Sequence, residues 1–300
     1  MHVLVTGGTG FIGRLLCARL HEAGHAVSVL TRDPARAQVP GARLVVALEQ
    51  AEGVDAVVNL AGASLFDRRW TDAYKQVLRA SRIDGTRRLV AWMARQPALP
   101  RVLVSGSAIG WYGPRDDAPL DETVAPGEDF AAWLCRDWEA EAMRATALGV
   151  RTCLLRTGIV LDRGGGALEK MLPPFRFGLG GPMGDGRQWM SWIHREDLVR
   201  LAIWLIGQPG AQGAFNGTAP GPVANGVFAR TLGTVLRRPA RLRVPGFALR
   251  LALGEMAGLL LSGQRVLPTR ALDAGFAFLH PGLEGALRAS LDAPAGAGGR

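Results

Sequence analysis

Residues 3–13 read Val-Leu-Val-Thr-Gly-Gly-Thr-Gly-Phe-Ile-Gly, in which a short apolar segment runs directly into glycines at positions 7, 10 and 13. The apolar segment predicts a buried β-strand. Gly7 permits a sharp turn, Gly10 leaves room for a pyrophosphate to approach the backbone, and Gly13 lets the following helix pack closely on the strand. This stretch therefore predicts a dinucleotide-binding strand–turn–helix unit.

A helix after the turn is predicted by apolar residues at helical spacing, namely Phe11, Ile12, Leu15, Leu16 and Leu20. Free backbone N–H groups and the helix dipole favour an anion at its N-terminus. We therefore expect Thr9, Phe11 and Ile12 to contact the diphosphate together with the three glycines. A glycine turn with a purely structural role is the alternative, but the strand before it and the helix after it favour nucleotide binding.

The composition is that of an enzyme-sized globular protein. A length of 300 residues suggests about two domains, or one large domain with a lobe. The first predicted strand follows Met1-His2 directly, so no signal peptide is expected and we expect the protein to be cytoplasmic. The three cysteines form no C-x-x-C pair, which argues against a disulfide framework and against a metal site.

The formal net charge of +9 raises the question of a nucleic-acid partner. The basic residues are nearly all arginines, spread along the chain without a dense basic run, so no nucleic-acid binding is predicted. The apolar stretch 247–261 is too short to span a membrane and is interrupted by Arg250 and Glu255, so it predicts a packed helix. No feature indicates an oligomer, and the expected partner is a small-molecule substrate.

Strand-like and helix-like segments alternate through the first two thirds of the chain. The strand candidates are short, apolar and rich in branched residues: 3–5, 26–30, 43–46, 56–60, 101–104 and 152–156. The helix candidates between them are 10–23, 71–95 and 129–148. This alternation predicts an α/β fold, a doubly wound parallel sheet of the Rossmann type, in which ligands bind beyond the carboxyl ends of the strands.

The pattern changes after Arg156. Segment 162–194 is rich in glycine and proline and predicts loops on the substrate side, followed by a helix at 196–206 and a strand at 214–216. We expect three parts: a nucleotide-binding core over 1–230, a smaller, mainly helical C-terminal substrate lobe over 231–292, and a disordered tail over 293–300.

The end of the second predicted strand indicates which nicotinamide cofactor is bound. An acid at this position binds the ribose 2′-OH of NAD(H), whereas an arginine accommodates the 2′-phosphate of NADP(H). The strand ends Leu30-Thr31-Arg32-Asp33, and Thr31 with Arg32 at the tip favours NADP(H). The alternative makes Asp33 the ribose acid, but Asp33-Pro34 also reads as the N-cap and first residue of a short helix.

Small residues follow the fourth predicted strand, in the sequence Leu60-Ala61-Gly62. They would let the chain pass close to the cofactor, although an ordinary strand that ends at glycine is an equal alternative. Ser105, directly after the next strand, and Arg82 complete the set of residues that we expect to bind the cofactor.

Several motifs beyond the glycine turn resemble those of the extended short-chain dehydrogenase/reductase superfamily. They are Asn59-Leu60-Ala61-Gly62, Ser105-Gly106-Ser107, Tyr112-Gly113 and Trp192-Ile193-His194-x-x-Asp197. A narrower set is similar to the atypical epimerase-family proteins related to SDR39U, which belong to the NAD-dependent epimerase/dehydratase proteins. That set is Asp67-Arg68-Arg69-Trp70-Thr71, Ser81-Arg82, Asp137-Trp138-Glu139, Leu155-Arg156-Thr157-Gly158-Ile159-Val160-Leu161, Lys170-Met171-Leu172-Pro173 and Gly178-Leu179-Gly180-Gly181-Pro182. The resemblance covers almost the whole chain and implies an NADP(H)-binding oxidoreductase or epimerase, whose C-terminal part is a small domain of unknown function.

The chain departs from the superfamily in its acid–base residues. The resemblance implies proton transfer by a Tyr-x-x-x-Lys pair, in which the lysine lowers the pKa of the tyrosine. The only tyrosines are Tyr74 and Tyr112, and neither has a lysine four residues later. In the helix at 129–148, the positions that align with the pair are Trp133 and Asp137, which do not provide this chemistry.

Three other residues are candidates for the reaction. Ser107 matches the hydroxyl that orients the substrate oxygen, with a cap or loop hydroxyl as the alternative. Tyr112 would direct its phenol toward the nicotinamide, or else serve in packing. His194 would transfer protons near neutral pH, or else tie the substrate loop to the core. The arginines at 69, 82 and 187 are suited to an anionic substrate.

Together these observations predict an NADPH-dependent oxidoreductase that acts on a small, anionic carbonyl or hydroxyl compound. A protein that binds NADP(H) without catalysis, as a redox sensor, is the second hypothesis. A nucleotide-sugar epimerase or dehydratase is the third.

Overall fold

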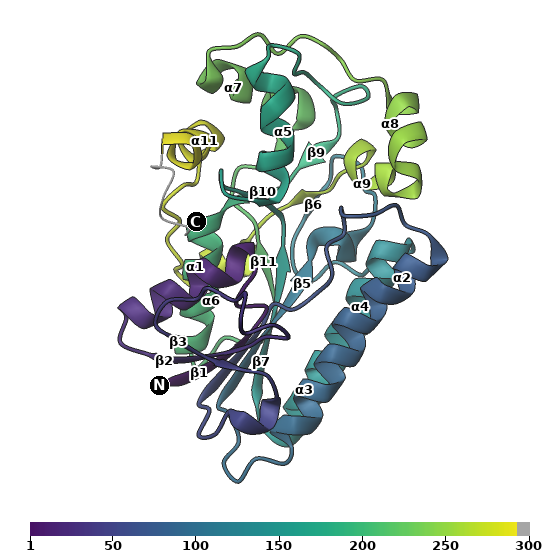
Figure 1. Ribbon diagram of the computed structural model, residues 1–300. Coiled ribbons are helices and arrows are strands. Elements are labelled where there is room, and N and C mark those ends of the chain that lie inside the picture. The colour runs from purple at the N-terminus through teal and green to yellow at the C-terminus, as the bar shows by residue number, and fades with distance from the viewer. Residues whose placement is uncertain (293–300) are drawn as a thin grey trace.

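Seven short strands form one parallel sheet in the computed structural model, which describes residues 1–292 (Figure 1). They are β1 (His2–Thr6), β2 (Ala26–Leu30), β3 (Ala42–Val45), β4 (Ala56–Asn59), β5 (Val102–Ala108), β7 (Arg151–Thr157) and β11 (Gly213–Gly217). Their order is β11-β7-β5-β4-β1-β2-β3, so the winding reverses between β1 and β4. The predicted doubly wound α/β fold is confirmed, and the reversal is where such sheets bind ligands.

Helices cover both faces of this sheet (Figure 1). On one face lie α1 (Phe11–Glu22) and α6 (Arg195–Gly207), and on the other α3 (Gly85–Met93) and α4 (Phe130–Met143). Successive residues of a strand point to opposite faces, so Val3 and Val5 join the core beneath α1 whereas Leu4 joins the core beneath α3. The strands are apolar on both faces because both faces are covered.

The two long predicted helices are each divided. Segment 71–95 forms α2 (Asp72–Arg79), a π-helical turn at Ala80–Asp84, and α3. Segment 129–148 forms α4 and ends in a 3-10 helix at Arg144–Leu148. Shorter 3-10 turns lie at Leu48–Gln50 and Ile109–Tyr112. The π turn is relevant to function because such turns often occur at binding sites.

A helical lobe lies above the sheet in Figure 1 and consists of α5, α7, α8, α9 and α11. Its apolar core joins α5 (Gly166–Arg176), α7 (Asn225–Leu236) and α11 (Leu283–Asp292). Three two-stranded pairs connect it to the rest: β8 (Ile159–Leu161) with β10 (Trp192–His194), β9 (Trp189–Met190) with β12 (Val223–Ala224), and β6 (Pro119–Leu120) with β13 (Arg265–Val266). The mainly helical C-terminal region agrees with the predicted architecture, although the predicted domain boundary at residue 230 falls inside α7.

Two local predictions were wrong. Segment 162–194 was expected to be loop, but α5 occupies 166–176 with two prolines inside it. Leu168, Leu172 and Phe175 are buried on one face of this helix, and that burial outweighs the loss of two backbone N–H donors. The single helix expected over 247–261 is broken into α8 (Gly246–Leu253), a 3-10 turn and α9 (Gly258–Leu261), because Gly254 adopts a positive φ of 63°.

The remaining helix is α10 (Thr269–Asp273), which packs beside β11. Among residues 1–292, no helix combines the length and apolar character needed to cross a membrane. The predicted tail at 293–300 lies outside the described residues.

Candidate functional site

The glycine turn between β1 and α1 is a backbone cradle that side chains would fill. Gly7 has a positive φ of 72°, and a Cβ there would lie 2.7 Å from the carbonyl carbon of Leu60. A Cβ on Gly13 would overlap the carbonyl oxygen of Gly7. Gly10 is exposed, and its N–H donates to the Gly7 carbonyl at 3.0 Å. The turn therefore requires glycine at positions 7 and 13 for its shape, and leaves Gly10 open to a ligand at the N-terminus of α1.

A cationic group stands at the tip of β2, beside this turn. Arg32 is exposed and has no carboxylate within ion-pair distance in the described part of the chain. Asp33 is engaged instead by Arg36, at 3.5 Å. The short helix predicted to begin at Asp33 is absent, and the segment forms a turn in which the Asp33 carboxylate accepts the Arg36 N–H. The free guanidinium suits a phosphate better than Asp33 suits a ribose.

A buried polar network lies beneath the cradle, at the end of β4. The Asn59 side chain accepts from the Thr6 hydroxyl at 2.6 Å and donates to the Thr86 hydroxyl at 2.8 Å. Ser105 also belongs to this network and is fully buried. The Ser105 side chain is engaged in this network, and its assignment as a cofactor-binding residue stays a prediction. Ser105 supports the site because it helps to hold β4 against β5.

Arg82 faces the loop that follows β4. Its guanidinium carbon lies 3.0 Å from the position that a Cβ on Gly62 would occupy, while Leu60 and Ala61 precede that glycine at the strand end. The π turn at Ala80–Asp84 carries Arg82 inward, over the ring of Trp138. Burial lowers the pKa of Arg82, and no carboxylate pairs with it in residues 1–292. Arg82 is half-buried, and a partly desolvated cation without a counter-ion is suited to an anionic ligand.

Ser107, near the end of β5, contacts a buried ion pair. Its hydroxyl donates to Glu139 Oε1 at 2.6 Å. Glu139 is held in turn by both ends of the Arg156 guanidinium, at 2.9 and 3.0 Å. Because the Ser107 hydroxyl donates its only proton to the hydrogen bond with Glu139, the Ser107 oxygen can only accept a hydrogen bond from a ligand. This arrangement favours a ligand hydroxyl at Ser107 over a carbonyl oxygen.

The phenol of Tyr112 is not available as an acid, because it is buried and hydrogen-bonded within the protein. Its side chain is fully buried, and its hydroxyl donates to Asn216 Oδ1 at 2.7 Å and accepts from Arg156 at 3.2 Å. Burial raises the pKa of Tyr112 to about 12. The phenol is therefore a poor proton donor or acceptor near neutral pH, and the packing alternative accounts for it.

His194 is also held in a structural position. Its Nδ1 accepts the N–H of Glu196 at 3.2 Å, which caps α6. Its ring lies 4.0 Å from that of His280. Burial, and then the neighbouring His280, lowers the pKa of His194 from 6.5 to about 4. A neutral, capping imidazole fits the alternative in which His194 ties the substrate loop to the core.

The depressed pKa of His194 makes stability depend on pH. The unfolded chain takes up this proton near pH 6.5 and the folded chain only near pH 4. The stabilisation is therefore complete above pH 6.5 and is lost as the pH falls toward 4, by about 3 kcal/mol. In urea titrations between pH 4 and 7, His194→Asn should flatten this dependence, whereas replacement of the exposed His21 should leave it unchanged. An unchanged slope in His194→Asn would contradict the assignment.

The positions aligned with the missing Tyr-x-x-x-Lys pair provide no acid–base chemistry. Trp133 is 48% exposed on α4, and Asp137 forms an ion pair with Arg79 at 2.9 Å.

Two of the predicted anion-binding arginines differ from each other in availability. Arg69 donates to backbone carbonyls at the end of α8, whereas Arg187 is exposed. Within residues 1–292, no group of three His, Cys, Asp or Glu side chains could hold a metal ion.

Sequence reasoning missed the roles of Glu139 and Arg156. A signal was present, because Arg156 ends the predicted buried strand 152–156 and a buried arginine needs a partner. The partner could not be identified from the sequence, since Glu139 lies on α4 and is brought to β7 only by the fold.

Comparisons with known proteins match nearly the whole chain. The model of the "NAD dependent epimerase/dehydratase family" matches residues 3–216, and that of a "Domain of unknown function (DUF1731)" matches residues 244–290. The chain is 44% identical to "Epimerase family protein SDR39U1 homolog, chloroplastic" of Arabidopsis thaliana, over 96% of this chain and 86% of that protein. It is 38% identical to "Epimerase family protein YfhF" of Bacillus subtilis, over 96% of this chain and 97% of that protein.

A solved structure is also similar. It is the human epimerase family protein SDR39U1 (isoform 2), crystallised with NADPH. The TM-score is 0.90 at 34% identity, covering 98% of this chain and 100% of the human one. UDP-glucose 4-epimerase from Thermotoga maritima, at a TM-score of 0.79 and 19% identity, shares the fold.

Proposed function

Since this chain belongs to the NAD-dependent epimerase/dehydratase family, we propose that it binds NADP(H) at the glycine turn and uses it as an oxidoreductase on a small hydroxyl or carbonyl compound. The resemblance predicted from the motifs is confirmed by the family model and by the SDR39U1-type relatives. The observation that carries the binding proposal is the backbone cradle that a Cβ at position 7 or 13 would fill.

The residues of the site fit the parts of NADP(H) in order. The diphosphate would lie on the free N–H groups at the start of α1, beside Thr9 and Gly10. The 2′-phosphate would meet Arg32, whose guanidinium has no competing carboxylate. Arg82, half-buried and without a carboxylate partner opposite Gly62, would meet a further anionic group of the cofactor or of the substrate. NADPH in the human relative supports this assignment.

Bound NADPH would supply a hydride to a carbonyl substrate and bound NADP⁺ would accept one from an alcohol, and in either direction the chain must move a proton at the substrate oxygen. Ser107 accepts a hydrogen bond from a substrate hydroxyl while it donates to Glu139. In the direction of alcohol oxidation, the hydroxyl proton passes to Ser107 and the Ser107 proton passes to Glu139. Arg156 orients Glu139 through two hydrogen bonds, so that Glu139 Oε1 faces the Ser107 hydroxyl.

Turnover tests the oxidoreductase proposal. Purified protein would be assayed for NADPH oxidation and NADP⁺ reduction against a library of small carbonyl and hydroxyl compounds. With an active substrate, Ser107→Ala should lower kcat by about 10²-fold or more and leave the Kd for NADPH unchanged. Ser191→Ala is the matched control, since Ser191 is also buried but bonds to the backbone of Gln264.

A second function is favoured by the state of the other candidate residues. Tyr112 and His194 are both buried and hydrogen-bonded, and the Tyr-x-x-x-Lys pair is absent. A protein that binds NADP(H) as a sensor would keep the cradle without an acid. Tight NADPH binding with no turnover on any compound would support this second function and overturn the first.

Cofactor preference tests the role of Arg32. Arg32→Asp should weaken NADPH binding by about ten- to a hundredfold, because a charge-assisted contact to the 2′-phosphate is replaced by repulsion. NADH binding should change little. Calorimetry with both cofactors measures the difference, with Arg43→Asp on β3 as a charge-matched control. Equal losses for NADPH and NADH would refute the assignment of Arg32.

A further inference from the structure

Five arginines line one cavity on the helical lobe, away from the glycine turn. The cavity has a volume of about 590 Å³, and its lining includes Arg230, Arg237, Arg238, Arg241 and Arg243. We call it the arginine cavity. Figure 1 shows α7, which forms one wall, at the top of the molecule, whereas β1 lies at the lower left. The expectation that the chain has no dense basic run is wrong here, because four of residues 237–243 are arginine.

The fold gathers these charges at the end of α7. The chain reverses after residue 236, and the Arg238 N–H donates back to the Gly233 carbonyl at 2.9 Å. Gly233 allows this close return, since a Cβ there would lie 2.6 Å from the Cβ of Ala240. The small residues form a floor, and Thr234 adds a hydroxyl to the lining. The lining therefore combines these small residues with five exposed arginine side chains.

The charges of the arginine cavity are not neutralised by the protein. Within residues 1–292, none of its five guanidinium groups forms an ion pair or a hydrogen bond, whereas fourteen ion pairs form elsewhere in the same residues. Like charges at close range repel one another. The C-terminus of α7 favours cations, but no guanidinium of the cavity bonds to its last carbonyls. An anion from solution would therefore relieve the repulsion that the fold leaves in place.

The backbone at Arg237 gives an independent reason to expect a ligand. Arg237 ends α7 with φ 54° and ψ 43° in the left-handed region, and no other non-glycine residue among 1–292 has a positive φ. Glycine or asparagine is the preferred residue at this position of a helix end. An arginine in this left-handed conformation makes the folded state less stable than a glycine would. A function of the arginine side chain would account for its presence at this position.

From this geometry we propose that the arginine cavity binds a small anion that carries at least two phosphate groups. Guanidinium forks bind phosphate oxygens in pairs, and a cavity of about 590 Å³ accommodates a molecule of nucleotide size. The proposal does not depend on NADP(H), because the lining contains no residue of the glycine turn, of the Arg32 segment or of the Ser107 network.

The test uses the full chain and inorganic pyrophosphate in calorimetry, with and without excess NADPH. With NADPH on the glycine turn, one site per chain should still bind pyrophosphate, with affinity that falls as salt is added; without NADPH the glycine turn is open to pyrophosphate as well. The double variant Arg237→Gly/Arg241→Gln should bind about a hundredfold more weakly. Because glycine suits the left-handed position, its thermal unfolding midpoint should not fall, which separates lost binding from lost structure.

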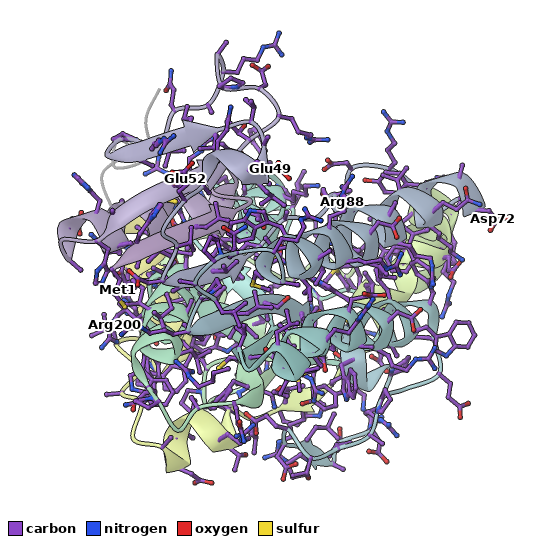
Figure 2. The ribbon with its side chains drawn as sticks, turned by 90° about the horizontal axis from the view of Figure 1, so that it is seen from below. Met1, Glu49, Glu52, Asp72, Arg88 and Arg200 are labelled. Atoms are coloured by element: carbon purple, nitrogen blue, oxygen red, sulfur yellow. The ribbon has the colours of Figure 1, made fainter. Side chains whose placement is uncertain are left out.

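A charge-matched control and three adverse outcomes complete the design. Arg43→Gln/Arg88→Gln removes two exposed arginines elsewhere; Arg43 lies on β3 and Arg88 on α3, where Figure 2 labels it. This control should bind pyrophosphate like the wild type. Equal weakening in both double variants, or no pyrophosphate binding when NADPH is present, would overturn the proposal. Binding of single-stranded RNA that depends on the same arginines, and that pyrophosphate does not displace, would also overturn the proposal, because it would indicate a nucleic-acid surface.

Discussion

Replacing Arg156 with methionine is expected to lower the free energy of unfolding by about 3–5 kcal/mol, because Glu139 would remain buried without a counter-ion. Both side chains are nearly inaccessible, with 4% and 5% exposure. Arg156 also donates to the Tyr112 hydroxyl and to the Glu122 carbonyl, and it stacks on the ring of Trp111. Urea unfolding at neutral pH measures the loss.

Two further variants show whether the loss comes from the stranded carboxylate. Arg156→Met/Glu139→Leu should recover much of the stability, since a well-packed apolar pair often replaces a buried ion pair without cost. Arg288→Met breaks an exposed pair with Glu284 and should cost less than about 1 kcal/mol. If the double variant were as unstable as the sum of its single variants, the stranded charge would not be the cause.

The second large effect is expected at the glycine turn. Gly13→Ala should reduce NADPH affinity by a hundredfold or more, because its Cβ would overlap the Gly7 carbonyl and displace the backbone that holds the diphosphate. Stability should fall as well. Calorimetry with NADPH, on protein shown to be folded by circular dichroism, measures the change in affinity.

Two other glycines separate the binding role from the folding role. Gly10→Ala should weaken NADPH binding with little loss of stability, because its Cβ would lie in the exposed cradle, 3.2 Å from the nearest atom, Gly7 O. Gly85→Ala, at the start of α3 with φ −59° and no atom within 4 Å of the new Cβ, should affect neither property. Unchanged NADPH affinity in both Gly10→Ala and Gly13→Ala would remove the basis for the proposed site.

The sheet and its nucleotide turn could be predicted because their causes are local. A buried strand, a glycine turn and an amphipathic helix follow from residues 3–20 alone, and the alternation of segments then requires a covered parallel sheet. Where the structure departed from these predictions, distant packing decided the outcome. The prolines at 173 and 174 indicated a loop, but the opposite face of that segment is buried against α7, which the local sequence does not reveal.

The chemistry of the site was harder to predict, for a related reason. Tyr112 and His194 carry suitable groups, yet their availability depends on Asn216 and His280, which are far away in the sequence. The ion pair of Glu139 and Arg156 exists only once α4 lies against β7. The motifs thus predicted the location of ligand binding more accurately than they predicted the side chain that exchanges a proton.

The way α11 completes the core of the helical lobe has a consequence for shortened forms of this protein. Leu283 and Leu287 of α11 lie in the same apolar cluster as Leu172 and Phe228. A ribosome that stopped before residue 283 would release a polypeptide with these partners uncovered. Such a product would expose apolar surface to chaperones and proteases, so a late nonsense mutation in the gene should act as a loss of the whole protein and not as the loss of one appendage.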